Sequence, residues 1–126
     1  MNNLLNLSNP DEINCQLLSY SRGHSEMYIQ IALAGEIQYI FLDGVVYFAG
    51  PQHWQGADFR LGTDEEFNSI AQSFDLLRRI VVEGFRDRYS LYLVSTRGGI
   101  DIKIIGSKER LFLVKDLPEH LYGLCD

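Results

Sequence analysis

Apolar and polar residues alternate with a period of two over several short stretches of the chain. Such alternation is typical of a β-strand with one buried face and one face in water. The stretches with this pattern are residues 13–17, 27–33, 37–42, 45–49, 57–61, 89–96, 100–105 and 111–115. The pattern therefore predicts about eight strands, with Cys15 at an inward position of the first.

Two short glycine-containing segments predict where neighbouring strands are joined. Asp43 and Gly44 separate two predicted strands, and an Asp-Gly pair tolerates the positive φ angles of a two-residue type I′ turn. We therefore expect residues 37–49 to form a β-hairpin. The Arg-Gly-Gly sequence at residues 97–99 predicts a second hairpin in the same way.

One α-helix is predicted after Gly62. Thr63 and Glu66 have the spacing of a capping box, in which each side chain accepts a hydrogen bond from the other residue's backbone N–H. The apolar residues that follow recur at helical spacing: Phe67, Ile70, Phe74 and Leu77. We expect the helix to run to about residue 79, and residues 117–121 to add a final helical turn.

These elements predict a single α+β domain spanning residues 1–126, in which residues 1–12 form an N-terminal arm. Short connections make neighbouring strands antiparallel. The strand–helix alternation of the doubly wound nucleotide-binding folds is missing. We expect a curved, mostly antiparallel sheet of about eight strands, either barrel-like or split in two, with one main helix after Gly62.

The overall charge narrows the range of partners. The chain of 126 residues carries a net charge of −6, whereas proteins that bind nucleic acids cluster Lys and Arg to neutralise phosphates. Nucleic acid is therefore not expected as a partner, and a protein partner is. Five arginines between residues 78 and 97 form the one place where an anion could dock, although the acids interleaved with them are their expected partners.

Cysteine and histidine are too few for a metal site. The chain holds two Cys and three His at spacings that match no zinc or redox motif, so we expect no metal and no cofactor. No apolar run approaches the roughly 20 residues that span a bilayer. The first ten residues lack the basic and apolar regions of a signal peptide. We expect a cytoplasmic protein that does not contact membranes and has free thiols.

The segment of residues 50–63 is the richest in residue types that bind ligands. Trp54 could supply a flat apolar wall, Arg60 an anion contact, and His53 with Asp58 a polar pair. In the alternative interpretation Trp54 packs against the core and Arg60 pairs with an acid at the start of the helix. The alternative is favoured, because a lone Trp in a small domain more often packs than binds.

No catalytic site is predicted. The chain has no Gly-x-Ser-x-Gly nucleophile turn, and helix capping accounts for the paired carboxylates Glu65 and Glu66. We expect a non-catalytic protein-interaction module of a bacterial type, acting as an immunity protein or a regulator. The alternative is a small-ligand binding protein or a minor enzyme, with a cavity of the curved sheet lined by tyrosines such as Tyr28, Tyr39, Tyr47 or Tyr92.

Overall fold

The computed structural model describes residues 4–5, 7–21, 26–33, 35–73, 88–99 and 101–116. These residues form nine β-strands, one α-helix (α1, Asp64–Ser73) and a short 3-10 helix (η1, Pro10–Glu12) at the end of the N-terminal arm. The predicted α+β class, with mostly antiparallel sheet and one main helix, is confirmed. In the described part of the chain, no helix is long and apolar enough to cross a membrane.

The strands form two separate antiparallel sheets, so the split architecture is the one observed. The five-stranded sheet has the order β5-β1-β2-β3-β9, and the four-stranded sheet has the order β4-β8-β7-β6. The strands of the five-stranded sheet are β1 (Asn14–Ser21), β2 (Glu26–Leu33), β3 (Glu36–Leu42), β5 (His53–Gln55) and β9 (Leu111–Val114). Those of the four-stranded sheet are β4 (Tyr47–Ala49), β6 (Asp58–Leu61), β7 (Tyr89–Ser95) and β8 (Ile102–Ser107).

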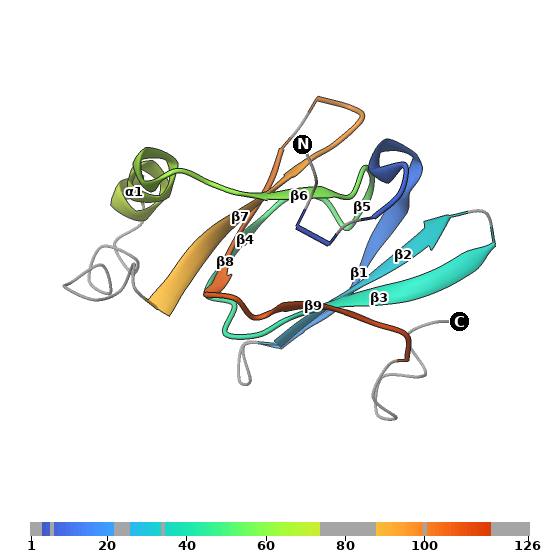
Figure 1. Cartoon of the computed structure of the whole chain (residues 1–126). Coiled ribbons are helices and arrows are strands. Elements are labelled where there is room, and N and C mark those ends of the chain that lie inside the picture. The colour runs from blue at the N-terminus through green and yellow to red at the C-terminus, as the bar shows by residue number, and fades with distance from the viewer. Residues whose placement is uncertain are drawn as a thin grey trace.

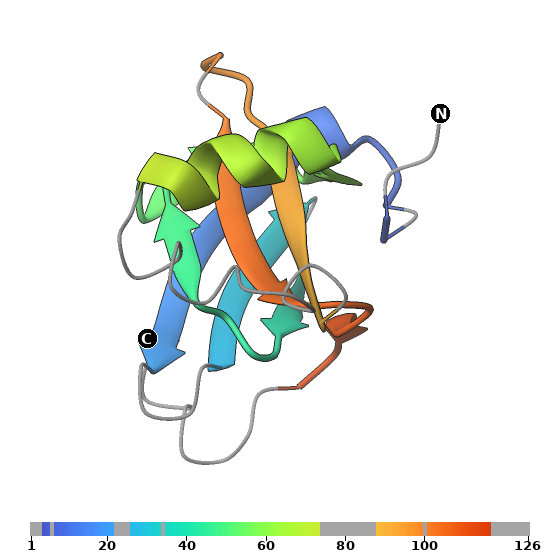
Figure 2. The same cartoon turned by 90° about the vertical axis from the view of Figure 1, so that its left-hand side faces the viewer.

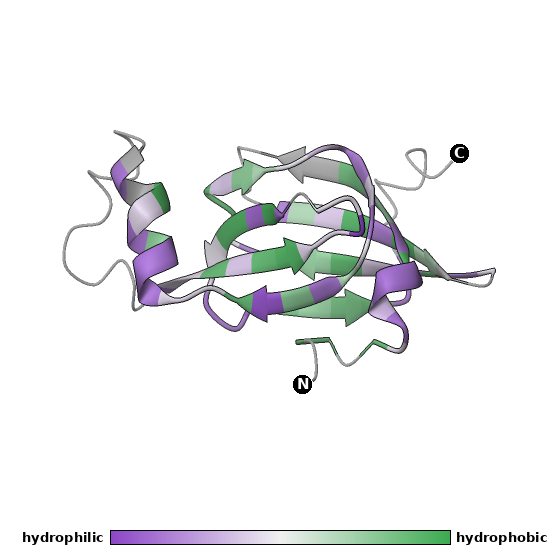
Figure 3. Cartoon of the chain, turned by 90° about the horizontal axis from the view of Figure 1, so that it is seen from above, coloured by the Kyte–Doolittle hydropathy of each residue, from purple (hydrophilic) through white to green (hydrophobic). Residues whose placement is uncertain are grey.

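The main core lies between the inner faces of the two sheets. Alternate residues of β2, namely Met27, Ile29 and Ile31, are buried there against residues of the other sheet such as Phe59 and Ile104. Figure 3 shows hydrophobic residues along the strands, whereas much of α1 is hydrophilic. Because side chains alternate across a strand, the residues between these core positions point to the outer face of each sheet.

Helix α1 covers the outer face of the four-stranded sheet. Phe67 and Ile70 pack on Leu91, Leu93 and Ile105, a second and smaller apolar cluster. Figure 2 shows the helix crossing in front of β7 and β8, with the five-stranded sheet behind them. The molecule therefore has three layers, and Figure 1 places α1 and the five-stranded sheet on opposite sides of the four-stranded sheet.

Several predicted features fall outside the described residues. The helix is described only to Ser73, so its predicted end near residue 79 lies in the part of the chain that is not described. The same holds for Phe74 and Leu77 of the apolar stripe, for Arg78, Arg79 and Arg86 of the arginine cluster, and for the predicted turn at residues 117–121.

The predicted hairpin at Asp43 and Gly44 is wrong. β3 pairs with β2 and β9 in one sheet, whereas β4 pairs with β8 in the other, so this segment carries the chain from sheet to sheet. Gly44 has a positive φ of 64°, but Asp43 does not. The Asp-Gly pair forms a local bend of the chain and does not join two paired strands. The pairing of the strands depends on longer-range contacts instead, because β3 pairs with β2 over seven residues.

The second predicted hairpin is confirmed. β7 and β8 pair antiparallel, with Val94 opposite Ile102, and Gly99 in the turn has a positive φ of 83°. Here the two strands remain neighbours in one sheet, so the local turn and the long-range pairing agree.

The N-terminal arm lies against β6 at the side of the sandwich. The Leu4 N–H donates a hydrogen bond to the Phe59 carbonyl at 2.9 Å, and Leu5 and Leu7 pack against the main core. The arm therefore places three leucines beside the space between the two sheets.

Candidate functional site

The four residues singled out from the sequence lie on two strands rather than in one loop. His53 and Trp54 belong to β5, a strand that the sequence pattern did not predict, and Asp58 and Arg60 belong to β6. Trp54 is only 9% exposed, and its indole N–H donates a hydrogen bond to the Gly56 carbonyl at 2.9 Å. The packing role favoured for Trp54 is therefore confirmed.

These residues do not converge on a common site. Trp54 points into the core, so its neighbour His53 points to the outer face of the five-stranded sheet. Phe59 also points into the core, so Asp58 and Arg60 lie on the outer face of the four-stranded sheet. The two outer faces point away from each other. A shared ligand site for the four residues stays a prediction without geometric support.

Arg60 has the partner expected from the structural alternative. Its guanidinium lies 3.7 Å from the Glu66 carboxylate at the start of α1. The same carboxylate accepts the Thr63 N–H at 2.9 Å, and the Thr63 hydroxyl accepts the Glu66 N–H at 3.1 Å, which confirms the predicted capping box. The Thr63 N–H, followed by Arg60, lowers the pKa of Glu66 below its ordinary value despite some desolvation.

The tyrosines proposed to line a cavity are divided among three surfaces. Tyr28 and Tyr39 form part of an apolar cluster on the outer face of the five-stranded sheet. Tyr47 packs in the cluster beneath α1. Tyr92 lies in the main core, and its hydroxyl donates a hydrogen bond to the Ser107 carbonyl at 2.7 Å. These four residues therefore do not surround one cavity.

A row of aromatic rings crosses the outer face of the five-stranded sheet. Tyr28, Phe41 and Phe112 stand opposite one another on β2, β3 and β9. The ring centroids of Tyr28 and Phe41 are 5.0 Å apart, and those of Phe41 and Phe112 are 6.4 Å apart with an interplanar angle of 11°. These separations are those of favourable aromatic pairs.

Further apolar residues extend this row into a surface that we call the aromatic face. Its members are Leu18, Tyr28, Ile37, Tyr39, Phe41 and Phe112. Ile37 is 51% exposed and Phe112 is 40% exposed. Within the described residues α1 is the only α-helix, and it lies on the far side of the molecule (Figure 1). The aromatic face is therefore not covered by helix α1.

The polar surroundings of the aromatic face combine amides with a few charged groups, because Glu26, Asp43 and Arg110 lie near its Tyr28–Phe112 end. Gln16 and Gln30 stand in one row with Tyr39, and His53 continues that row on β5. Arg110 lies at the border, with its guanidinium 5.2 Å from the Phe112 ring centroid and 3.2 Å from the Asp43 carboxylate. Amides and aromatic rings thus dominate a face of a chain that carries 28 charged side chains (11 basic and 17 acidic).

Burial and two nearby carboxylates raise the pKa of Tyr28, the central tyrosine of the aromatic face. Burial is the main cause that raises the pKa of Tyr28, and the negative charges of Glu26 and Asp43 raise it further. The Tyr28 phenol is therefore neutral at physiological pH and serves as a hydrogen-bonding group rather than a charge.

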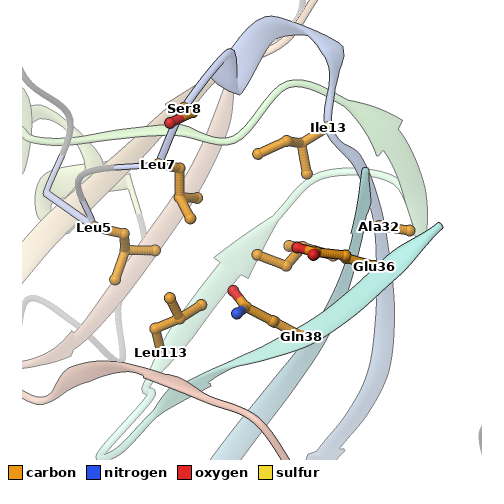
Figure 4. A pocket seen from close by; sticks show the side chains of 9 residues that line it. Leu5, Leu7, Ser8, Ile13, Ala32, Glu36, Gln38 and Leu113 are labelled. Carbon is orange, nitrogen blue, oxygen red and sulfur yellow. The ribbon is translucent and has the colours of Figure 1, made fainter. Parts of the chain in front are cut away.

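A separate groove opens beside the N-terminal arm. It has a volume of about 310 Å³ and is lined mainly by leucine and isoleucine side chains, including Leu5, Leu7 and Leu113. Figure 4 shows Glu36 and Gln38 reaching from β3 toward the leucines of the arm. An apolar groove with a carboxylate and an amide at its wall fits a small amphipathic molecule.

The described residues give little evidence for a metal site or for a nucleophilic cysteine. Across the described ranges, no three His, Cys, Asp or Glu side chains lie close enough to hold a metal ion. Cys15 is buried in β1, and burial raises the pKa of its thiol to about 12. Its sulfur lies 3.4 Å from the Gly56 carbonyl, so the thiol is held protonated inside the core.

Comparison with known proteins adds no family to this geometry: no protein-family model, curated protein sequence or solved structure matches the chain. The aromatic face was missed in the sequence, although its pattern is visible there. In β3, Tyr39 and Phe41 occupy the positions between the core residues Ile40 and Leu42, so both faces of this strand are apolar. A strand that is apolar on both faces predicts that its outer face contacts something else.

Proposed function

We propose that this protein is a non-catalytic protein-interaction module and that the aromatic face is its contact surface. The observation that carries the proposal is the exposure of Ile37 and Phe112 on a face that carries a row of neighbouring aromatic rings. Contiguous exposed apolar surface is uncommon on monomeric proteins and marks sites of interaction.

The composition of the aromatic face is that of a protein interface. The cores of interfaces are rich in Tyr, Phe and Arg and depleted in Lys, Glu and Asp. The aromatic face combines Tyr28, Tyr39 and Phe41 with Arg110 at its border and glutamines beside it. Aromatic side chains contribute strongly to binding because they bury a large area and lose little conformational entropy.

The residues of the aromatic face also indicate which class of partner would bind there. The apolar centre requires a partner with an apolar patch of its own, and the glutamine amides offer hydrogen bonds to a polypeptide backbone or to polar side chains. The Arg110 guanidinium is already paired with Asp43, so its charge is balanced within this chain. We infer a folded protein partner, for which this chain acts as an immunity protein or a regulator.

A matched pair of substitutions tests the proposal. Ile37 is 51% exposed on the aromatic face, and Leu61 is 53% exposed on β6 of the other sheet. The partner is captured from cells of the source with the wild-type chain, and its affinity is then measured by calorimetry. Ile37→Ser should weaken binding by about tenfold, the effect of losing one contributing interface residue. Leu61→Ser should leave binding within about twofold of wild type.

The outcome that contradicts the proposal is equally definite. If Ile37→Ser binds as tightly as wild type while Leu61→Ser weakens binding, the contact surface lies elsewhere. Circular dichroism of both variants controls for unfolding, because each substitution removes one exposed apolar side chain and leaves the buried core intact.

A second candidate function rests on the groove beside the N-terminal arm. We propose that, in this alternative, the protein carries a small amphipathic amine, because the groove joins apolar walls to the Glu36 carboxylate. Hexylammonium is a suitable probe. Titration followed by NMR should shift the methyl signals of Ile13 and Leu113 in a saturable way, and Glu36→Gln should abolish the shifts. Absence of shifts at millimolar probe would exclude this alternative.

A further inference from the structure

The outer face of the five-stranded sheet carries three parallel rows of side chains that cross the strands. The middle row, which we call the aromatic row, consists of Tyr28, Phe41 and Phe112. Two residues along the strands on one side lies a charged row of Glu26, Asp43 and Arg110. Two residues along on the other side lies a polar row of His53, Gln16, Gln30 and Tyr39. An aromatic stripe flanked by two polar rows therefore runs across the sheet.

The dimensions of these rows match those of an α-helix. Residues two apart along a strand are about 7 Å apart, so the charged row and the polar row stand about 14 Å from each other. A helix with its side chains is about 10–12 Å wide, so its flanks reach both rows when its axis follows the aromatic row. The ring centroids in that row are 5.0 and 6.4 Å apart. These separations bracket the helical pitch of about 5.4 Å, so successive turns can each contact one ring.

The other outer face of the sandwich shows the same kind of contact within this chain. Helix α1 crosses β7 and β8 (Figure 2) and packs Phe67 and Ile70, one helical turn apart, on the outer face of the four-stranded sheet. An amphipathic helix lying across the strands therefore covers one apolar outer face of this molecule. The aromatic face offers a comparable surface to a helix of the partner.

The charged row adds a requirement on that helix. Asp43 is paired with Arg110 at 3.2 Å, whereas Glu26 forms no ion pair with any other described residue. The Glu26 carboxylate lies close enough to Tyr28 to raise the pKa of its phenol, so it stands beside one end of the aromatic row. A lysine or arginine on the adjacent flank of the helix would pair with this carboxylate. Uncharged polar residues on the other flank would meet the glutamine amides of the polar row.

We propose that the partner binds the aromatic face through an amphipathic α-helix that lies across the strands. Its apolar residues, spaced three or four apart, contact the aromatic row, and a basic residue on one flank pairs with Glu26. The inference rests on the proposed function and specifies the element of the partner that the aromatic face recognises.

Photo-crosslinking in cells of the source measures the shape of the bound segment. Benzoylphenylalanine is placed in the full chain at position 18 or 112, because Leu18 on β1 packs beside Tyr28 and Phe112 lies on β9. These strands are three spacings apart, about 14 Å. The two attachment sites on the partner, located by mass spectrometry, should therefore lie about nine residues apart in one helix. An extended segment would place them about four residues apart.

Position 41 provides a second measurement between the ends. Its attachment site should lie three or four residues from that of position 112, and circular dichroism confirms that each variant is folded. A spacing of about four residues between the sites from positions 18 and 112 would overturn the helix, as would sites in separate segments of the partner. Either result would leave the aromatic face as the contact surface. No adduct from any of the three positions would contradict the proposed function and the helix together.

A matched pair of charge reversals tests the basic flank. Glu26→Lys alters the charged row, whereas Glu65→Lys makes the same change of net charge on α1, on the opposite side of the molecule (Figure 1). Calorimetry with the partner identified by crosslinking should show binding about tenfold weaker for Glu26→Lys. Glu65→Lys should bind within about twofold of wild type. Equal weakening by both variants would assign the effect to net charge and would overturn the pairing of Glu26 with a basic residue of the helix.

Discussion

The role of a single residue in this protein depends on the space around its side chain as much as on its chemical type. Gly44 allows the chain to cross between the sheets, because a Cβ atom there would collide with the Ser107 side chain. Cys15 is a potential nucleophile by type, yet burial in β1 leaves its thiol protonated. Trp54 is a potential ligand wall by type, yet its indole packs in the core.

Substitution at Gly44 separates backbone strain from crowding. Gly44 and Gly99 both have positive φ, but a Cβ at Gly99 meets no atom within 4 Å. Gly99→Ala should therefore cost about 1–2 kcal/mol from backbone strain alone. Gly44→Ala should cost at least about 1 kcal/mol more, because Ser107 must also move. Urea denaturation of both variants measures the difference, and equal costs would mean that the crossing segment has room to spare.

The thiol of Cys15 should be inert in the folded protein. A pKa raised to about 12 leaves almost no thiolate at pH 8, and only the thiolate reacts readily with thiol reagents. In a Cys125→Ser variant, where Cys15 is the only thiol, Ellman's reagent should react at a measurable rate only after denaturant is added. Rapid reaction without denaturant would show that β1 opens easily.

At the scale of elements, the sequence could predict the features that depend on local pattern but not those that depend on long-range strand pairing. The period-two pattern located eight of the nine described strands, and Thr63 with Glu66 located the start of α1. Strand β5 was missed, because its three residues include a single apolar side chain, Trp54, and so show no alternation. The turn at Asp43 was misread, because local φ preferences do not specify which strands pair.

The capping box should make the stability of the fold depend on pH. The pKa of Glu66 is lower in the folded protein than its ordinary value, so its carboxylate stabilises the folded state above the unfolded pKa. That contribution is lost as pH falls through the folded pKa. Wild type should therefore melt at a higher temperature than Glu66→Gln at pH 7, and the two curves should converge below about pH 4. A gap that persists at pH 3 would assign the effect to something other than this carboxylate.

At the scale of the whole molecule, the two outer faces of the sandwich differ in what covers them. Helix α1 covers the four-stranded sheet, whereas the aromatic face of the other sheet is left exposed at Ile37 and Phe112. The sequence could predict the class of fold but not this asymmetry. Which apolar residues of a two-faced strand remain exposed depends on the placement of the helix, and that is set by packing between distant segments. The predicted group around His53 does not converge because β5 and β6 belong to different sheets, whose outer faces point away from each other.

Photo-crosslinking in living cells of the source tests the central claim most directly. Benzoylphenylalanine is placed at position 37 on the aromatic face or, as the control, at position 61 on β6, where the native residues are similarly exposed. After irradiation, position 37 should yield a discrete adduct with another protein, identified by mass spectrometry, and position 61 should yield none. A discrete adduct from position 61 with none from position 37 would contradict the assignment of the aromatic face as the contact surface.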